Sequence, residues 1–312
     1  SDEEYRNNLY SLWTNYCVSE SYEPGSTFKP VTVASALEEG VVKDGDTYVC
    51  KGFETVADYK LKCHVFSTIG SHGSLTVEQA LMNSCNPYMI HLALEMGNSR
   101  FAYYQSLFGF GKITGIDLPG ETTGIVYGDR MTTIDAACNS FGQTINVNMM
   151  QMMAAYCSII NGGMLYQPHI VKRIESANGE VVKEYKANLV RQTITASTSK
   201  LLRRYLKNTV EEGTAKKAGV TGYSVAGKTG TAQKGDRKDN KWIISFIGHA
   251  PAENPKFAIY VVIDEPYGTT GTSGSSADVL TLTHNILEKL LPYMSVYKDA
   301  LDEPVDTSNS ED

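Results

Sequence analysis

The sequence predicts an α+β fold in which helices flank an antiparallel sheet. Apolar residues recur at helical spacing through the first half, whereas the later half contains short, strand-like apolar runs. Short polar turns join those runs, so neighbouring strands pair most simply as an antiparallel meander. Helices first and consecutive strands later are typical of the α+β class and not of alternating α/β folds.

The first predicted helix covers residues 26–41 and follows the turn Glu23-Pro24-Gly25. Its apolar residues have helical spacing with little polar interruption, so we expect most of this helix to be buried. Pro30 falls in its first turn, where the missing N–H costs nothing. Residues 50–63 are then predicted to form a short, irregular hairpin.

A second helical segment begins at Thr76, which has the spacing of a capping box with Gln79. It is predicted to break at Ser84-Cys85-Asn86 and to restart with Asn86 as the cap and the following proline at the first helical position. Gly97 is the predicted end of this segment. The remaining elements are predicted as helices over 149–160, 199–210 and 278–291, a hairpin over 170–185, and strands over 223–231, 242–248 and 257–263.

Composition excludes several classes of protein. The chain has 312 residues, of which 42% are hydrophobic and 20% are charged, as in ordinary globular proteins. Its net charge of −7, without a long Lys/Arg run, argues against nucleic acid as the main partner. The longest apolar run, 257–263, is far shorter than the roughly 20 residues of a membrane span. Six irregularly spaced cysteines are too few for a disulfide scaffold.

Ser26 and Lys29 are the first candidates for chemistry. Residues three apart lie on one helix face, so the two side chains can reach each other. A serine hydroxyl is a weak nucleophile until a base removes its proton, and burial can make a lysine that base by disfavouring its ammonium form. The same spacing recurs at Ser197 and Lys200, where an ordinary helix start explains it.

Two further motifs follow the first. Ser84-Cys85-Asn86 lies at the predicted helix break, where a hydroxyl can relay a proton and an amide can hold a peptide. Helix capping is the alternative, and Ser176-Ala177-Asn178 repeats the pattern in a predicted turn. Lys228-Thr229-Gly230-Thr231 lies on a predicted strand, where the lysine and threonines suit a substrate carboxylate and the glycine lets a substrate backbone approach. A solvated edge strand with a bulge is the alternative.

Together these motifs resemble the set found in penicillin-binding proteins and serine β-lactamases. Ser84 follows Ser26 by 58 residues, and Lys228 follows Ser84 by 144. The chain is similar to the transpeptidase domain of a class B, monofunctional penicillin-binding protein from a clostridia-like Gram-positive bacterium. The stretches that carry the resemblance are Glu23-Pro-Gly-Ser-Thr-Phe-Lys-Pro30, Ser84-Cys-Asn-Pro87, Asp117-Leu-Pro-Gly-Glu121 and Ala226-Gly-Lys-Thr-Gly-Thr-Ala-Gln233.

The resemblance implies a serine acyl-enzyme mechanism that requires no cofactor. Ser26 attacks the carbonyl of the D-Ala-D-Ala bond in a peptidoglycan stem peptide, and Lys29 takes its proton. Ser84 passes the proton to the departing D-Ala, with Lys228 as a second candidate for this transfer. A neighbouring stem peptide then releases the acyl group as a cross-link, and β-lactams acylate Ser26 in place of the substrate.

The resemblance also implies which residues bind the substrate. Asn86 orients the peptide, Thr229 and Thr231 hold its terminal carboxylate, and Gly230 lies between them in the same binding motif. The backbone N–H groups of Ser26 and Thr231 form the oxyanion hole. These roles belong to the family and are carried over here because the matching residue types occupy the matching positions.

The transpeptidase domain is assigned to residues 22–292, with an all-helical subregion over about 27–165, a sheet subregion over about 166–292, and the active site between them. Residues 1–21 form a lead-in segment, and residues 293–312 form an acidic tail that we expect to be disordered. Family members have sheet strands, a pedestal domain and a membrane anchor before the serine motif. We therefore expect a membrane-anchored parent at the extracytoplasmic face of the bacterial cell membrane, and first strands that are missing or supplied by another segment.

The cysteines suggest a separate feature, a structural zinc site. Cys50 and Cys63 bracket the predicted hairpin, with Asp58 and His72 close in sequence, and such ligand types form tetrahedral Zn²⁺ sites. His72 is preferred to His64 as the ligand, because the adjacent residues Cys63 and His64 point to opposite faces of a strand. A disulfide between Cys50 and Cys63, or two unpaired thiols, are the alternatives.

Two other functions share this scaffold. A serine β-lactamase needs a general base for fast deacylation, and the sequence offers only the stretch 117–121, which resembles the transpeptidase pattern. A penicillin-sensing receptor, or a non-catalytic scaffold of the division or sporulation machinery, is the other alternative. Intact Ser26, Lys29 and Lys228 argue against the scaffold but not against the sensor. The expected partners are stem peptides, β-lactams and a cell-wall synthesis complex.

Overall fold

The computed structural model describes residues 2–235, 241–266 and 275–299, so residues 300–312 of the predicted acidic tail lie outside the described range. The helices are α1 (Asp2–Leu12), α2 (Tyr16–Ser19), α3 (Lys29–Glu39), α4 (Val77–Met82), α5 (Asn86–Met96), α6 (Asn98–Leu107), α7 (Thr133–Asn139), α8 (Met149–Ile160), α9 (Ala196–Glu211) and α10 (Ala277–Tyr293), with 3₁₀ turns η1 (Gly25–Phe28), η2 (Gly128–Arg130) and η3 (Lys216–Ala218). The strands are β1 (Thr47–Cys50), β2 (Phe53–Val56), β3 (Tyr59–Lys62), β4 (Gly73–Thr76), β5 (Met164–Gln167), β6 (Arg173–Glu175), β7 (Val181–Glu184), β8 (Asn188–Gln192), β9 (Ala226–Lys234), β10 (Lys241–Ala250) and β11 (Phe257–Asp264).

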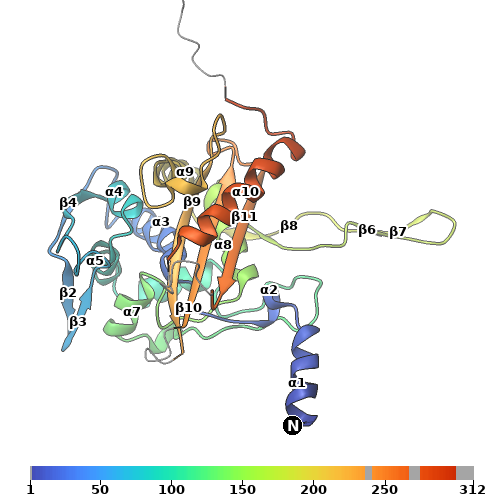
Figure 1. The fold of residues 1–312 in the computed structure, drawn as a ribbon, viewed down its shortest axis with the longest axis horizontal. Coiled ribbons are helices and arrows are strands. Elements are labelled where there is room, and N and C mark those ends of the chain that lie inside the picture. The colour runs from blue at the N-terminus through green and yellow to red at the C-terminus, as the bar shows by residue number, and fades with distance from the viewer. Residues whose placement is uncertain (1, 236–240, 267–274, 300–312) are drawn as a thin grey trace, which may run out of the picture.

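The main sheet of the described residues contains three antiparallel strands in the order β11-β10-β9, which confirms the predicted meander. Successive side chains along a strand point to opposite faces, so the sheet separates two cores. Ile244 and Phe246 of β10 face the core that α10 covers, and Ile247 faces the core that contains α3, α8 and α9. Figure 1 shows α10 lying along the sheet. Helices on both faces of an antiparallel sheet confirm the α+β prediction.

Helix α3 is at the centre of the helical side. Its residues from Lys29 to Ala36 are all buried, which confirms the burial predicted from their apolar spacing. The predicted helix begins as the 3₁₀ turn η1 and continues as α3, with Pro30 in the first turn of α3. Because η1 packs against β9, this helix start delivers Ser26 to the edge of the sheet.

The chain turns sharply between α4 and α5, as predicted. The predicted capping box starts α4, and Gly97 ends α5. Ser84 in the turn has a φ of 54°, in the left-handed region that side chains rarely adopt. The prediction that Asn86 caps α5 is wrong. Cys85 occupies the N-cap position and Asn86 is the first helical residue, because the Asn86 side chain is bound by other partners in the candidate site.

The predicted all-helical subregion also contains strands, contrary to prediction. Two small antiparallel sheets, β1–β4 and β2–β3, lie within it, and β2–β3 is the hairpin predicted over 50–63. Strands β1 and β4 were not predicted because they pair across a long stretch of chain, from Thr47 to Thr76, and no local turn signal joins them. The hairpin predicted over 170–185 is confirmed as β6–β7, and it projects away from the body of the molecule (Figure 1).

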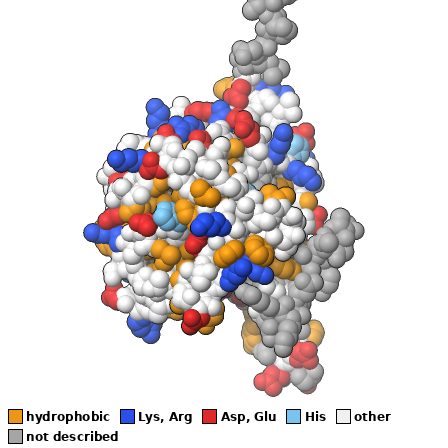
Figure 2. Space-filling model, turned by 90° about the vertical axis from the view of Figure 1, so that its left-hand side faces the viewer, with side chains coloured by type: hydrophobic (Ala, Val, Ile, Leu, Met, Phe, Trp, Pro, Cys, Tyr) orange, Lys and Arg blue, Asp and Glu red, His pale blue; other side chains and the backbone are white. Residues whose placement is uncertain are grey.

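The helices of residues 2–235, 241–266 and 275–299 include none with both the length and the apolar character of a membrane span. On the face shown in Figure 2, Lys and Arg side chains are interspersed with Asp and Glu side chains. Neither sign of charge gathers there into one large patch.

Candidate active site

The first motif lies where η1 meets the main sheet. Ser26 is in η1, and Lys29 begins α3 immediately after it. Gly25 has a φ of 57°, and a Cβ atom on it would lie only 2.6 Å from the carbonyl oxygen of Thr231. Glycine alone tolerates this conformation and this approach. The contact holds the serine turn directly against β9, so two motifs that are far apart in the sequence meet.

Lys29 is fully buried, and its amino group has three oxygen partners. Its Nζ lies 2.6 Å from the Ser84 carbonyl oxygen, 3.0 Å from Ser84 Oγ and 2.7 Å from Asn86 Oδ1. Burial lowers the pKa of the Lys29 ammonium to about 8, because an apolar environment disfavours the charged form. An appreciable fraction of Lys29 is therefore the neutral amine near physiological pH.

The partners of Lys29 determine where its lone pair points. Two of them are carbonyl oxygens, which can only accept hydrogen bonds. In the neutral amine, two N–H bonds serve those oxygens and the lone pair faces Ser84 Oγ, the partner that has a proton to give. Ser84 Oγ also lies 3.0 Å from Ser26 Oγ. The three side chains thus form a continuous hydrogen-bonded path from the Ser26 hydroxyl to a base.

Strand β9 forms the opposite wall of the site. Lys228 is fully buried, and its Nζ lies 3.2 Å from the Thr229 carbonyl oxygen and 3.4 Å from Thr229 Oγ1. Burial first, and then the charge of Lys29, lower the pKa of Lys228 well below its usual range. Within the described residues Lys228 has no carboxylate partner. A negatively charged ligand that binds in front of it would therefore stabilise its ammonium form.

The three motifs surround a cleft of about 420 Å³. Five of the predicted site residues line it, namely Ser26, Ser84, Asn86, Thr229 and Thr231, whereas the two lysines lie buried behind its surface. The other lining residues are His64, which the sequence suggested only as an alternative metal ligand, and five that it did not suggest, namely Phe141, Gln143, Thr214, Trp242 and Ser276. No motif marks them, because they come from separate segments that only the fold brings together.

The missing side chain of Gly230 makes room for packing. Alternation along β9 turns Thr229 and Thr231 to the cleft and Gly230 to the other side. A Cβ atom on Gly230 would lie 2.5 Å from Ser245 Oγ, 2.8 Å from Thr27 Cγ2 and 2.9 Å from the Pro24 carbonyl oxygen. The absent side chain therefore gives space to the turn that carries the candidate nucleophile.

Gly230→Ala should lower the free energy of unfolding by about 1–3 kcal/mol, because the added methyl group must displace the η1 turn. Urea unfolding followed by circular dichroism measures this loss. Gly219→Ala is the matched control, since its new Cβ atom would lie 3.3 Å from its nearest neighbour and its backbone is extended. An unchanged urea midpoint for Gly230→Ala would contradict the packing role.

The second copies of the first two motifs lie in a helix start and in a turn. Ser197 and Lys200 are exposed in the first turns of α9, whose N-cap is Thr195, which confirms the ordinary helix start. Ser176 and Asn178 hydrogen-bond each other in the turn between β6 and β7. Among the described residues neither pair has a buried lysine beside it, whereas Ser26 and Ser84 lie next to the buried Lys29. Burial, and not sequence spacing, therefore distinguishes the copies.

Three of the predicted metal ligands meet beside the second motif. Cys50, Cys63 and His72 form a group with Cys85, and the potential ligand atoms of all four lie within 4.8 Å of one another. The prediction of Asp58 as a ligand is wrong, because Asp58 is exposed in the turn between β2 and β3 and does not belong to the group. Cys85 from the second motif supplies the fourth ligand atom instead.

His64 and the thiols of Cys50 and Cys63 were the subject of alternative predictions, and the structure places each of them. His64 is outside the group, and its Nε2 lies 2.9 Å from the Asn83 carbonyl oxygen. All six cysteines lie in the described range as free thiols, which contradicts a disulfide between Cys50 and Cys63 and agrees with the alternative of two unpaired thiols. Hydrogen bonds from Cys85, and then from His72, lower the pKa of the Cys63 thiol.

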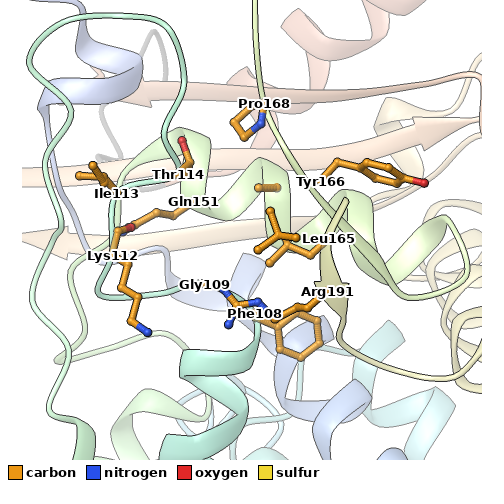
Figure 3. Close-up of a pocket in the computed structure, with 12 residues that line it drawn as sticks. Phe108, Gly109, Lys112, Ile113, Thr114, Gln151, Leu165, Tyr166, Pro168 and Arg191 are labelled. Atoms are coloured by element: carbon orange, nitrogen blue, oxygen red, sulfur yellow. The ribbon is translucent and has the colours of Figure 1, made fainter. Parts of the chain in front are cut away.

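A second pocket, of about 90 Å³, lies elsewhere on the molecule (Figure 3). It shares no lining residue with the Ser26 cleft, and among the described residues its lining contains no Ser, Cys, His, Asp or Glu. Gln151 of α8 reaches it and donates hydrogen bonds from Nε2 to the carbonyl oxygens of Lys112 and Thr123. These bonds hold the neighbouring loops beside the pocket.

The fold and the site together define the class of penicillin-binding proteins and serine β-lactamases, in which a Ser-x-x-Lys turn faces a Lys-Thr-Gly strand. Residues 1–288 match the family described as the penicillin binding protein transpeptidase domain. The chain belongs to this family.

Relatives agree with this placement. Stage V sporulation protein D of Bacillus subtilis (strain 168) is 41% identical over 288 residues, which are 90% of this chain and 44% of that protein. Peptidoglycan D,D-transpeptidase FtsI of Escherichia coli (strain K12) is 32% identical over 293 residues, which cover 92% and 46%. This chain therefore spans less than half the length of either relative.

Solved structures have the same fold. The crystal structure of Penicillin binding protein 3 from Mycobacterium tuberculosis complexed with ampicillin matches with a TM-score of 0.82 at 29% identity, over 93% of this chain and 66% of that one. The D,D-transpeptidase domain of a peptidoglycan glycosyltransferase from Eggerthella lenta matches with a TM-score of 0.82 at 26% identity, over 95% and 71%.

Proposed function

We propose that this chain is a D,D-transpeptidase domain that cross-links peptidoglycan stem peptides through an acyl-enzyme on Ser26, and that β-lactams acylate the same serine. The observation that carries the proposal is the hydrogen-bonded path Ser26–Ser84–Lys29, which opens on a cleft bordered by Thr229 and Thr231. The names of the relatives and the ampicillin bound to one of them support it.

In the acylation step, Ser26 Oγ attacks the carbonyl carbon of the D-Ala-D-Ala bond. As the new C–O bond forms, the Ser26 proton passes to Ser84 Oγ, and the Ser84 proton passes to the lone pair of neutral Lys29. The products are a tetrahedral oxyanion and a Lys29 ammonium. The backbone N–H groups of Ser26 and Thr231, whose turn and strand are in contact, stabilise the oxyanion.

Collapse of the tetrahedral intermediate breaks the C–N bond. Lys29 returns its proton through Ser84 to the departing nitrogen, and D-Ala leaves while the acyl group remains on Ser26. The substrate carboxylate binds at Thr229 and Thr231, and its charge favours the protonated form of Lys228 behind them. In the second half-reaction, the amine of another stem peptide attacks the acyl carbon, and the same path returns a proton to Ser26.

The lining of the cleft favours a transpeptidase over a β-lactamase. Fast hydrolysis of the acyl-enzyme needs a base that activates water, and among the described residues no Asp or Glu lines the cleft. Glu121, the carboxylate that the sequence offered, accepts hydrogen bonds from the backbone N–H groups of Thr114 and Gly115. It therefore holds a loop, and a long-lived penicillin adduct is expected.

Two measurements test the function. Time-resolved labelling with a fluorescent penicillin should give one stable adduct, and rapid turnover of that adduct would indicate a β-lactamase. Incubation with a D-Ala-D-Ala stem peptide and an acceptor amine should release D-Ala and give a cross-linked product by mass spectrometry. Stable labelling without D-Ala release would point to the penicillin-sensing receptor instead.

Thr231→Val should slow penicillin labelling by about 10–100-fold, because the variant loses a hydrogen bond to the carboxylate worth roughly 1.5–3 kcal/mol. Stopped labelling reactions on gels give the rate at several penicillin concentrations. Valine has nearly the same shape as threonine, so the urea midpoint should stay within error of the wild type. A rate equal to that of the wild type would remove Thr231 from carboxylate binding.

The cellular context is proposed from the relatives. Identity is higher to Stage V sporulation protein D (41%) than to FtsI (32%), which favours a role in sporulation over one in division. The parent protein is then membrane-anchored and works at the extracytoplasmic face within a cell-wall synthesis complex. A Bacillus subtilis strain whose Stage V sporulation protein D carries this domain in place of its own should form heat-resistant spores, and failure of a stably expressed chimera would count against this role.

A further inference from the structure

We propose that the pocket of Figure 3 is a docking site for a partner protein, and that it binds an aspartate or glutamate side chain flanked by apolar residues of that partner. We call it the Arg191 pocket. Its lining comes from the end of α6, the loop that follows α6, α8, β5 and β8. It shares no lining residue with the Ser26 cleft, so the inference does not rest on the proposed function.

Two cations line the Arg191 pocket without a counter-charge. They are Lys112 and Arg191, and among the described residues neither forms an ion pair. The Arg191 Nε atom is buried and has no hydrogen-bond partner within the described parts of the chain. Most buried polar groups in proteins are hydrogen-bonded. A buried N–H without a partner, beside a pocket that opens to the surface, therefore points to an acceptor from outside the chain.

The pairing of β5 and β8 places Arg191 in the pocket. Arg191 lies opposite Leu165, and both line the pocket, so this face of the strand pair is turned toward α8. The register shifts between Leu165 and Tyr166, as in a β-bulge. Such an irregularity redirects side chains, which explains how the consecutive residues Val190 and Arg191 both reach one pocket.

The carboxylates of the neighbouring loop are already engaged. Glu121 accepts hydrogen bonds from two backbone N–H groups of that loop. Asp117 accepts hydrogen bonds from the backbone N–H groups of Ile170 and Val171, which connect β5 to β6. Neither carboxylate lines the Arg191 pocket. These bonds fix the surrounding loops, and the guanidinium of Arg191 keeps its capacity for an incoming carboxylate.

The size and walls of the pocket restrict the ligand to one short side chain. Its volume of about 90 Å³ holds roughly three water molecules, whereas sites for free small ligands usually measure about 300–1,000 Å³. Phe108 and Leu165 give it apolar walls, and the polar Gln151 is occupied by its hydrogen bonds to the loops. A carboxylate on a short apolar stem matches these walls and the Arg191 guanidinium together.

Exposed apolar side chains around the pocket favour a protein segment over a free small molecule. Ile113, Tyr166 and Val190 line the pocket, yet they are 59%, 42% and 47% exposed. Leu189 is also exposed and lies directly opposite Tyr166 across the strand pair. Apolar residues gathered around a pocket are typical of a protein-binding surface, in which one anchor side chain fills the pocket. Apolar residues on either side of the acidic anchor would cover this rim.

The first probe is 3-methylbutanoate, a carboxylate on a short apolar stem. It is titrated into the full chain with ¹³C-labelled Ile, Leu and Val methyl groups, so that Ile113, Leu165 and Val190 report from the pocket. Their signals should shift and saturate. The neutral isostere 3-methylbutanamide should bind at least about tenfold more weakly, because a hydrogen bond to a carboxylate is charge-assisted. Equal binding of acid and amide, or tighter binding of inorganic phosphate, would overturn the proposal.

A peptide tests the partner as a protein segment. The probe is a blocked five-residue peptide with glutamate at its centre and two apolar residues, leucine and valine, on each side. It should shift the same methyl signals and bind at least about tenfold more tightly than 3-methylbutanoate, because its apolar residues cover the exposed rim. The same peptide with glutamine at its centre should lose about tenfold in affinity. A glutamate peptide no tighter than the free acid would exclude docking of a protein segment.

Arg191→Met removes the guanidinium and keeps an apolar side chain in its place. It should weaken binding of the glutamate peptide at least about tenfold and leave the glutamine peptide unaffected. Arg173→Met is the matched control, since Arg173 is exposed on β6 and pairs with Glu175 outside the pocket. Unchanged affinity in a folded Arg191→Met would contradict the role of Arg191. If this variant does not fold, the two peptides compared on the wild type still decide the question.

Two other occupants of the pocket would show themselves in the same experiments. Sedimentation should find a monomer over the concentration range of the titrations, and dimers that Arg191→Met abolishes would assign the pocket to a second copy of this chain. A synthetic peptide of residues 300–312, which is acidic and contains Leu301 and Val305, should not displace the glutamate peptide. Displacement would assign the pocket to the chain's own tail. Either result would overturn a partner protein as the occupant.

Discussion

Ser26→Ala should abolish penicillin labelling, with a loss of at least about 10³-fold in acylation rate, because the variant has no oxygen to form the acyl bond. It should also release no D-Ala from a stem peptide. Labelling is read as fluorescence on denaturing gels after incubations that extend well beyond the wild-type reaction. The Ser26 side chain lines a cleft and supports little packing, so stability should change little.

The second Ser-x-x-Lys copy provides the control for this experiment. Ser197→Ala removes a serine with the same sequence spacing, but that serine is exposed on α9 and has no buried lysine beside it. It should label at the wild-type rate. Full labelling of Ser26→Ala, or loss of labelling in Ser197→Ala, would place the nucleophile elsewhere and break the assignment of the site.

Lys29→Met should slow acylation by about 10²–10⁴-fold, the range typical of a lost general base. Methionine keeps most of the length of the side chain and fills the buried space without a charge. The Ser84 hydroxyl then has no acceptor for its proton, so the path from Ser26 ends without a base. Labelling rates at several penicillin concentrations separate this loss from weaker binding.

The pH profile identifies the cause of that loss. Only neutral Lys29 can accept a proton, and burial lowers its pKa to about 8, so the wild-type labelling rate should rise with pH through about 8 and then level off. Lys29→Met should lose this rise. Lys200→Met, which changes the exposed lysine of the second copy, should keep both the rate and the profile. A wild-type rate that is flat from pH 6 to 10 (roughly two units either side of that pKa) would exclude Lys29 as the titrating base.

Most secondary structure could be predicted because its signals are local. Apolar spacing located α3, α8, α9 and α10, a capping box marked the start of α4, and apolar runs with short turns located β9, β10 and β11. One prediction failed because a distant partner competed with a local one. Asparagine is a good N-cap residue, but in the folded chain the Asn86 side chain accepts a hydrogen bond from Lys29. Cys85 therefore occupies the N-cap position of α5.

The candidate site could be predicted only as far as its motifs extend. Ser26, Lys29, Ser84 and Lys228 stand in recognisable triplets and tetrads, so their order revealed the family. Phe141, Gln143, Thr214, Trp242 and Ser276 line the same cleft without any such signal. Whether these residues line the cleft depends on which loops are brought to its opening by the packing of η1, β9 and α5. That packing is determined by residues spread over the whole chain.

By itself the sequence determined the α+β class, the order of the three motifs and the membership in the penicillin-binding protein family. These follow from motif spacing and apolar periodicity, which can be read along the chain without knowledge of its three-dimensional contacts. Only the tertiary structure decided that Gly230 gives space to the serine turn, that Lys29 is buried enough for its pKa to fall, and that Cys85 replaces Asp58 in the group with Cys50 and Cys63. Each of these depends on burial or on contacts between distant segments. Such contacts arise when the chain packs, and no local pattern encodes them.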